Sequence, residues 1–203
     1  MELSEKFKNI FESNEWGGSE SRSGTGSSLD ATKKLRMELP FLFLKYDIKS
    51  ILDIPCGDFN WMKNLDLDTI SYAGADIVED IVLQNRWKYP NKKFLTLDII
   101  NDQLPIADLV FVRDCLGHLS EQNVIKAIKN IQQSGSKYLL ATSFPSKQIN
   151  YPILDGQWHP INLTVLPFKL KPIYLINEDC REAYPYYNDK SMLLFDLSNL
   201  YSS

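Results

Sequence analysis

Three aspartates in the first half of the chain stand where short apolar segments end. Asp53 lies in SILDIPCG, Asp76 ends SYAGAD, and Asp98 ends KFLTLD. Such segments are typical of buried β-strands, and parallel strands bring their carboxyl ends to one edge of a sheet, where ligands bind in open α/β folds. One aspartate at a strand end is a common turn former. Three of them predict a site where carboxylates hold one polar ligand.

The spacing of the first two aspartates fits a site for a ribose-containing ligand. Asp53 and Asp76 lie 76 − 53 = 23 positions apart, and a Rossmann-type unit needs about 20 residues between its phosphate loop and the carboxylate that holds ribose. A carboxylate binds two vicinal hydroxyls well, because each hydroxyl can donate to one oxygen. After Asp53, Pro55 and Gly57 break the chain into a tight loop whose backbone N–H groups can face a ligand.

Candidates for a general base follow the apolar segment at 108–113, DLVFVR. Asp114 and His118 come directly after it, at the edge where such a base would have to stand. Each has a structural alternative, since Asp114 can pair with Arg113 or cap a turn, and His118 can be a packed or helix-capping residue. His159 is a further base candidate, and its alternative is a surface loop residue.

Two loops carry further candidates. The stretch at 16–28, WGGSESRSGTGSS, is dense in glycine and serine, which fits a flexible linker. Its tryptophan and its pair of opposite charges favour a loop that folds over a polar ligand. Tyr184, Tyr186 and Tyr187 lie in a second loop, where they either line an acceptor pocket or close the end of the sheet.

Strands and helices alternate along the chain and position these residues. Helices are expected at 2–13, from Ser27 or Ser28 to a stop or kink at Pro40, at 60–65, at 77–89 and from the cap Ser120 to Ile131. Strands are expected at 50–54, 71–76, 93–98, 108–113 and 137–142, and two more at 172–178 and 190–197. No helix is expected at 145–172. The expected fold is α/β, with a Rossmann-like, doubly wound, mostly parallel seven-stranded sheet and an antiparallel last strand.

Composition narrows the classes of function. The 203 residues, 44% of them hydrophobic, suffice for one α/β domain with a substantial core. A formal charge of −4 without a Lys/Arg cluster argues against a nucleic-acid partner. Cys56, Cys115 and Cys180 form no CxxC pair, which predicts reduced thiols and no metal site. Charges throughout MELSEKFKNIFE predict no signal peptide and no membrane span, so the expected location is cytoplasmic.

The strand and loop around Asp53 resemble the first motif of class I S-adenosylmethionine (SAM)-dependent methyltransferases, an acidic residue followed by alternating glycines. Gly57 keeps the central glycine of that motif, whereas Pro55 replaces the first and Phe59 the last. With the other strand-end acids and the segment at 113–119, the resemblance covers most of residues 29–197.

The resemblance implies SAM as cofactor and S-adenosylhomocysteine as product. Asp53 and the loop through Gly57 would lie near the amino-acid part of SAM. Asp76 would hold the ribose, and Asp98 with Ile99 the adenine. The glycine-serine loop would supply contacts that the missing glycines do not. The residues thus placed at the cofactor are Trp16, Ser23, Gly24, Asp53, Cys56, Gly57, Asp76, Ile77, Asp98, Ile99 and Arg113.

The resemblance further implies an enzyme with an N-terminal helix and lid loop at 1–28 and a methyltransferase domain at 29–203. Its methyl group would pass to an oxygen or nitrogen of a small polar or saccharide-type acceptor, a reaction that depends mainly on alignment and exclusion of water. The segments SFP and WHPIN, together with the glycine-serine loop, also look like a group of small bacterial methyltransferases of surface-polysaccharide biosynthesis.

Two other functions stay open. One is an NAD(P)-dependent oxidoreductase on a related sheet, which would favour a GxGxxG turn and no acid inside the first strand; this chain has neither feature. The other is a SAM-binding subunit without turnover that serves a partner, which the incomplete glycine motif permits.

Overall fold

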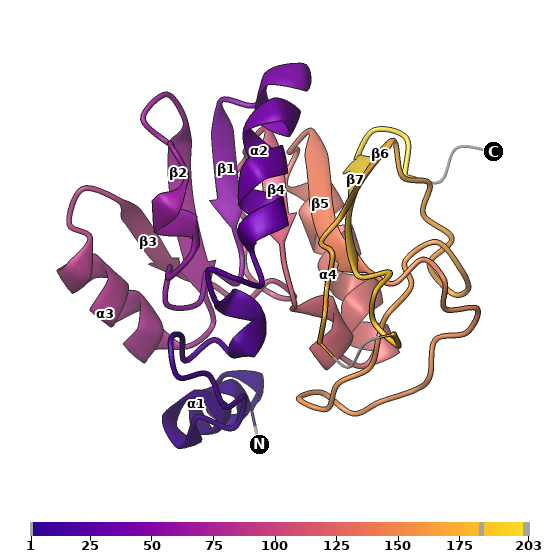
Figure 1. Cartoon of the computed structure of the whole chain (residues 1–203), viewed down its shortest axis with the longest axis horizontal. Helices are drawn as coiled ribbons and strands as arrows, with labels where there is room; N and C mark the ends of the chain where they lie inside the picture. Colours follow the sequence, from indigo (N-terminus) through magenta and orange to yellow (C-terminus); the bar gives the residue numbers. More distant parts are fainter. Residues whose placement is uncertain (1, 183–184, 201–203) are drawn as a thin grey trace.

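One seven-stranded sheet with helices on both faces organises the computed structural model, which describes residues 2–182 and 185–200 (Figure 1). The strand order is β3-β2-β1-β4-β5-β7-β6. The first five strands of this order, from β3 through β2, β1 and β4 to β5, run parallel. Strand β7 runs antiparallel to both β5 and β6. The predicted doubly wound sheet is confirmed. The strands are β1 (Ser50–Asp53), β2 (Ser71–Asp76), β3 (Lys93–Thr96), β4 (Leu109–Val112), β5 (Tyr138–Ser143), β6 (Tyr174–Asn177) and β7 (Ser191–Asp196).

Helices cover the two faces of the sheet with apolar side chains. Leu35 and Leu39 of α2 are fully buried on one face, and Val124 and Ile131 of α4 on the other. The α-helices are α1 (Leu3–Ser13), α2 (Lys33–Lys45), α3 (Glu79–Lys88) and α4 (Glu121–Gln133). Short 3-10 turns lie at Thr25–Ser27, Met62–Asn64 and Leu116–His118. In the ranges that the structure describes, no helix combines the length and the apolar character that a membrane crossing needs.

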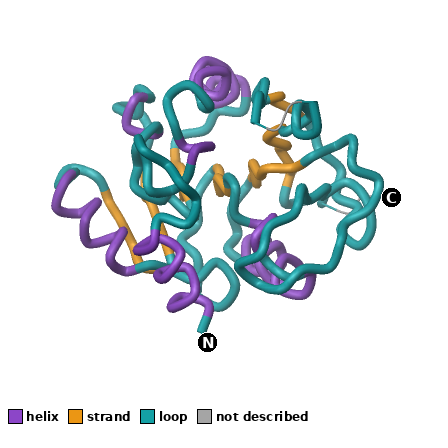
Figure 2. Tube along the Cα trace, turned by 60° about the horizontal axis from the view of Figure 1, so that its bottom comes forward, coloured by secondary structure: helices purple, strands orange, loops and turns teal. Residues whose placement is uncertain are grey.

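The register of the parallel strands sets which residues meet at the carboxyl edge. Asp53 pairs with Gly74 of β2 and with Phe111 of β4, and Asp76 pairs with Thr96 of β3. Strand β3 ends at Thr96, so Asp98 follows the strand by two positions and does not end it as predicted. Helix α1 lies below this edge in Figure 1, and Figure 2 looks toward it.

Helix α2 differs from the prediction at Pro40, which neither ends the helix nor separates it from the next turns. The helix runs on to Lys45 with Pro40 on its exposed side. A proline inside a helix removes one backbone hydrogen bond and costs about 3 kcal/mol. Leu39 before the proline and Leu42 and Phe43 after it are buried, and this packing offsets the local cost.

The start of α2 also differs from the prediction. The helix begins at Lys33 and not near Ser28. Ser28 instead organises a preceding turn, because its hydroxyl accepts a hydrogen bond from the Ala31 N–H at 3.2 Å and its carbonyl accepts from Thr32. Serine side chains that bond nearby backbone groups in this way compete with helix formation.

Candidate functional site

A cavity of about 620 Å³ lies at the carboxyl edge of the sheet. Its volume is in the range of about 300 to 1,000 Å³ that is typical of small-molecule sites. Asp53, Asp76 and Asp98 all line it, so the structure brings the three predicted carboxylates to one place. Among residues 2–182 and 185–200, no three His, Cys, Asp or Glu side chains are arranged to hold a metal ion.

Two of these aspartates are deeply buried. The Asp53 carboxylate accepts a hydrogen bond from the Tyr72 hydroxyl at 2.6 Å, and burial raises the pKa of Asp53 to about 7 although this bond lowers it. Asp76 accepts hydrogen bonds from the Gly57 N–H at 3.2 Å and the Val78 N–H at 2.9 Å. Burial raises the pKa of Asp76 to about 6 against the effect of these amides. A ligand that donates hydrogen bonds or is positively charged would favour both ionised forms.

The third aspartate lies beside apolar side chains. Asp98 accepts hydrogen bonds from the Ile100 N–H at 2.8 Å and the Asn101 side-chain amide at 2.7 Å, which fix its carboxylate. Ile99 is buried and lines the cavity, and Ile77 lines it after β2. This part of the cavity combines a hydrogen-bond acceptor with apolar surface, as a flat heterocyclic ring with an amino group requires.

The loop after β1 contains one glycine, and two of its residues have a left-handed backbone. Gly57 has φ +51°, and a Cβ atom there would lie 2.2 Å from the Ser23 Oγ. Phe59 also adopts a left-handed backbone, with φ 59°, which is rare for a bulky residue. Its ring is buried against Tyr72 and Phe94, with centroids 5.1 and 5.4 Å away. Phe59 therefore closes the core behind the loop and leaves the cavity side to other residues.

The glycine-serine loop is fastened to this turn. Asp58 accepts hydrogen bonds from the Ser21 hydroxyl at 2.9 Å and the Arg22 N–H at 3.0 Å, and its own N–H donates to the Ser23 Oγ at 3.0 Å. Ser23 and the residues at 24–27 line the cavity. The loop thus forms a wall of the cavity, which favours the interpretation as a ligand-covering loop over the interpretation as a linker.

Aromatic side chains from the N-terminal segment surround His118. The Trp16 and Phe7 rings lie 5.5 and 6.5 Å from the imidazole, and all three residues line the cavity. The His118 Nδ1 is buried without a hydrogen-bond partner among the described residues. Burial lowers the pKa of His118, although Asp114 nearby raises it. The imidazole is therefore neutral at pH 7 and can accept a proton.

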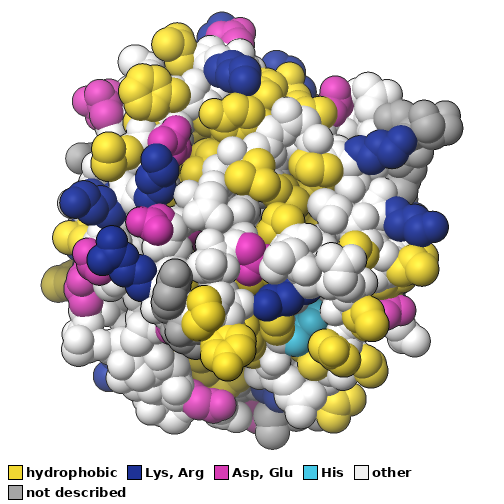
Figure 3. All heavy atoms as spheres, turned by 45° about the vertical axis from the view of Figure 1, so that its right-hand side comes forward, with side chains coloured by type: hydrophobic (Ala, Val, Ile, Leu, Met, Phe, Trp, Pro, Cys, Tyr) yellow, Lys and Arg dark blue, Asp and Glu magenta, His cyan; other side chains and the backbone are white. Residues whose placement is uncertain are grey.

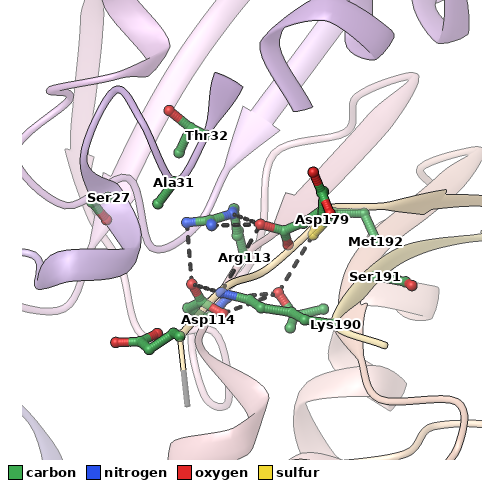
Figure 4. A network of polar contacts seen from close by, with 12 residues as sticks. Ser27, Ala31, Thr32, Arg113, Asp114, Asp179, Lys190, Ser191 and Met192 are labelled. Atoms are coloured by element: carbon green, nitrogen blue, oxygen red, sulfur yellow. Dashed lines mark hydrogen bonds and ion pairs between the residues drawn. The ribbon is translucent and has the colours of Figure 1, made fainter. Parts of the chain in front are cut away.

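Asp114 lies in a cluster of buried charges, and Figure 4 shows its side chain joined to those of Arg113 and Lys190. Its Oδ2 lies 2.7 Å from the Lys190 Nζ and 3.1 Å from the Arg113 Nη1. Burial raises the pKa of Asp114, but these two cations hold it well below its usual range. Asp114 therefore stays ionised at neutral pH and is a weak base, as the alternative interpretation of pairing with Arg113 predicts.

Sequence reasoning missed two members of this cluster. The Glu178 carboxylate accepts two hydrogen bonds from the Arg113 guanidinium, at 2.6 and 3.1 Å. The Lys190 ammonium donates one to Asp114 at 2.7 Å. A signal for them was present, because Glu178 directly follows the apolar β6 and Lys190 directly precedes the apolar β7. Charged residues at strand ends on this edge of the sheet therefore indicate the site as strongly as the three aspartates do.

His159 does not fit its predicted role as a base. It is 8% exposed and is not among the residues that line the cavity. The backbone N–H of His159 donates to the Gly117 carbonyl at 3.0 Å, and the adjacent Trp158 lines the cavity instead. The insert that holds both residues is fixed to the loop around His118.

Of the three tyrosines considered as an acceptor wall, Tyr187 lines the cavity, whereas Tyr186 is 71% exposed and does not line it. Tyr184 lies outside the described residues. The Tyr187 ring packs against Trp158 and Phe144, which also line the cavity and which sequence analysis did not assign. Phe144 directly follows β5, so its position on this edge could have been predicted.

Comparison with known proteins identifies the fold. No protein-family model matches the sequence, and no curated protein matches it. Magnesium protoporphyrin IX methyltransferase from Synechocystis PCC 6803, with bound SAM, has a TM-score of 0.62 and 14% identity over 96% of each chain. N-methyltransferase NodS from Bradyrhizobium japonicum WM9, in complex with S-adenosyl-L-homocysteine, has a TM-score of 0.62 and 14% identity over 93% of this chain and 98% of that one. These likenesses show that the chain has the fold of SAM-dependent methyltransferases.

Proposed function

We propose that this chain is a methyltransferase that binds SAM in the cavity and transfers its methyl group to an oxygen or nitrogen of a small polar acceptor. The observation that carries the proposal is the meeting of Asp53, Asp76 and Asp98 in one cavity, at the carboxyl edge of a sheet with this fold. Such an edge is where nucleotide-like ligands bind in open α/β folds.

The residues present fit SAM chemically. Each Asp76 oxygen accepts a backbone N–H, and a carboxylate oxygen has a further lone pair for a ribose hydroxyl. Asp98 and Ile99 offer an acceptor and an apolar surface for adenine. SAM has a net charge of about +1, from a sulfonium, an ammonium and a carboxylate, and burying such a charge requires opposite charges nearby. The buried carboxylates supply them.

The protein's part in the reaction is alignment, exclusion of water and acceptance of a proton. When bound, SAM supplies an electrophilic methyl group. Helix α1 and the glycine-serine loop cover the cavity, and Asp58 holds this loop in place. His118 lines the cavity with a neutral imidazole, which can take the proton that the acceptor loses.

In this proposal residues 1–28 are the lid segment and residues 29–203 the methyltransferase domain. The acceptor is a small polar or saccharide-type molecule. Its place in surface-polysaccharide biosynthesis is supported by the resemblance of the SFP and WHPIN segments and of the glycine-serine loop.

Replacing Asp76 by alanine should weaken SAM binding by about 1.5 to 3 kcal/mol, because the ribose hydroxyls lose a charged acceptor. Wild-type affinity should rise between pH 5 and pH 8. The pKa of Asp76 is about 6 in the free protein. At lower pH Asp76 is protonated in the free protein and must lose this proton before SAM binds, which weakens the measured affinity. Calorimetric titration with SAM at several pH values measures both effects, and the rise should be smaller in the variant.

The control is Asp68→Ala, which removes an exposed carboxylate from the loop before β2. Its affinity for SAM should equal that of the wild type. If Asp76→Ala binds SAM as tightly as this control does, Asp76 does not hold the ribose.

A further inference from the structure

The half of the cavity away from Asp53, Asp76 and Asp98 has its own chemistry. It is formed at the ends of β4 and β5 and in the loop before β7, by Asp114, Phe144, Tyr187 and Lys190 together with Trp158. Given the proposed function, on which this inference rests, this half is left for the acceptor. Figure 3 shows an acidic, a basic and a histidine side chain close together among hydrophobic ones, near the middle of one face of the molecule.

Three aromatic rings form one wall of this half. Phe144, Trp158 and Tyr187 pack edge to face, with centroids 5.1 to 6.0 Å apart and interplanar angles of 73° to 83°. Trp158 remains 40% exposed. Aromatic faces bind the apolar face of another ring and attract cations. This wall therefore suits a ring-shaped molecule, and a positive charge on it strengthens the contact.

Asp114 lines the same space, and one of its two oxygens takes no part in the ion pairs. Both cations bind its Oδ2, at 2.7 Å for Lys190 and 3.1 Å for Arg113. Its Oδ1 has one contact in the described structure, with the Thr142 hydroxyl at 3.5 Å, which is a long hydrogen bond. The side chain is 32% exposed, and its backbone has φ 50°, in the left-handed region. The fold thus holds an ionised carboxylate in place with an oxygen free for a ligand.

The cations of the cavity are already neutralised by the protein. Arg113 also binds Glu178 at 2.6 Å, and the Lys190 Nζ lies 4.0 Å from the same carboxylate. Arg113 and Lys190 are the only Lys or Arg side chains among the described residues that line the cavity, and the carboxylates that line it outnumber them. The lining carboxylates are those of Glu15, Asp53, Asp76, Asp98, Asp114 and Glu182. A phosphate or carboxylate group on the acceptor would meet repulsion and no free cation.

We infer that the acceptor is an amine carried on a ring, whose ring packs on Trp158 and Tyr187 while its amino group donates to the Asp114 Oδ1. The excess of carboxylates along the cavity draws in the ammonium form, and the neutral His118 can take its proton. The lone pair of the amine nitrogen then forms the new N–C bond, and the C–S bond of the sulfonium breaks with its electrons left on sulfur. The methylated ammonium finally loses a second proton to solvent.

The test is a titration of the full chain, saturated with S-adenosylhomocysteine, with ring compounds that differ in one group. One series is glucosamine, glucose and glucose phosphate, and the other is benzylamine, benzyl alcohol and benzyl phosphate. In at least one series the amine should bind about tenfold more tightly than its hydroxyl and phosphate counterparts. If neither amine binds more tightly than its counterparts, the inference is overturned.

The variant Asp114→Asn keeps the shape of the side chain and removes its charge. It should abolish the preference for the amine and leave the affinity for S-adenosylhomocysteine unchanged, whereas the exposed control Asp68→Asn should keep both. If Asp114→Asn still binds the amine more tightly than its counterparts, Asp114 is not the partner of the amino group and the inference is overturned. Failure of wild-type protein to bind S-adenosylhomocysteine at all would instead sink the proposed function, so the two failures are distinguishable.

Discussion

Replacing Glu178 by glutamine is expected to lower the free energy of unfolding by about 3 to 5 kcal/mol. Glu178 is 1% exposed in its side chain, and it is the main partner of Arg113, which is 5% exposed. Without the charge of Glu178, the two buried cations Arg113 and Lys190 share the single carboxylate of Asp114. One positive charge is then uncompensated in a medium of low polarity. Arg113 keeps its charge in the variant, because a guanidinium does not lose its proton in proteins and the Asp114 carboxylate remains 3.1 Å away.

Thermal or denaturant unfolding measures this effect. For a chain of this length, the expected loss corresponds to a melting temperature about 6 to 20 °C lower. The matched control is Asp179→Asn, the next residue along the chain, whose 75% exposed carboxylate has one ion pair at 3.9 Å. An exposed pair of this kind contributes about 0 to 1 kcal/mol. Equal stability of the two variants would show that Arg113 does not depend on Glu178.

Replacing His118 by glutamine is expected to slow methyl transfer about 100-fold while SAM affinity stays unchanged. Glutamine fills similar space but cannot take a proton, and a positioned general base contributes about 10² to 10⁴ in rate. Because the neutral imidazole is the active form, the wild-type rate should fall at acidic pH as His118 gains a proton. Burial lowers the pKa of His118, so this fall should occur below the pH at which a free histidine titrates.

The comparison is made with methyl-labelled SAM and acceptor, both at saturating concentration at every pH, so that the loss of SAM affinity at low pH does not affect the rate. His159→Gln is the control, because His159 is the other histidine and does not line the cavity. The acidic fall in rate should disappear in His118→Gln and persist in His159→Gln. If the two variants keep the same rate, or if His159→Gln is the slower one, His118 is not the base.

Most of the fold could be predicted because its signals are local. Each strand is a short apolar run, and β4, buried on both faces, reads as the centre of a parallel sheet. The misjudged boundaries of α2 have a different origin. Pro40 and Ser28 carry strong local preferences, and distant contacts of Leu39 and Leu42 decide where the helix runs. Such contacts are not visible in a single sequence.

The candidate site could be predicted where chemistry coincides with strand ends. Asp53, Asp76 and Asp98 were found in this way. Glu178 lies far from Asp114 in the sequence, and only the antiparallel pairing of β7 with β5 and β6 brings its strand to that edge. The position of His159 could not be predicted, because the irregular insert that carries it has no periodic pattern.

Binding of SAM to the unmodified chain is the most direct test of the account. Calorimetry with SAM, S-adenosylhomocysteine and NAD(H) should show micromolar binding of the first two, which corresponds to about −8 kcal/mol, and none of the dinucleotide. Binding of NAD(H) with no binding of SAM would contradict the account and would assign the cavity to a dinucleotide.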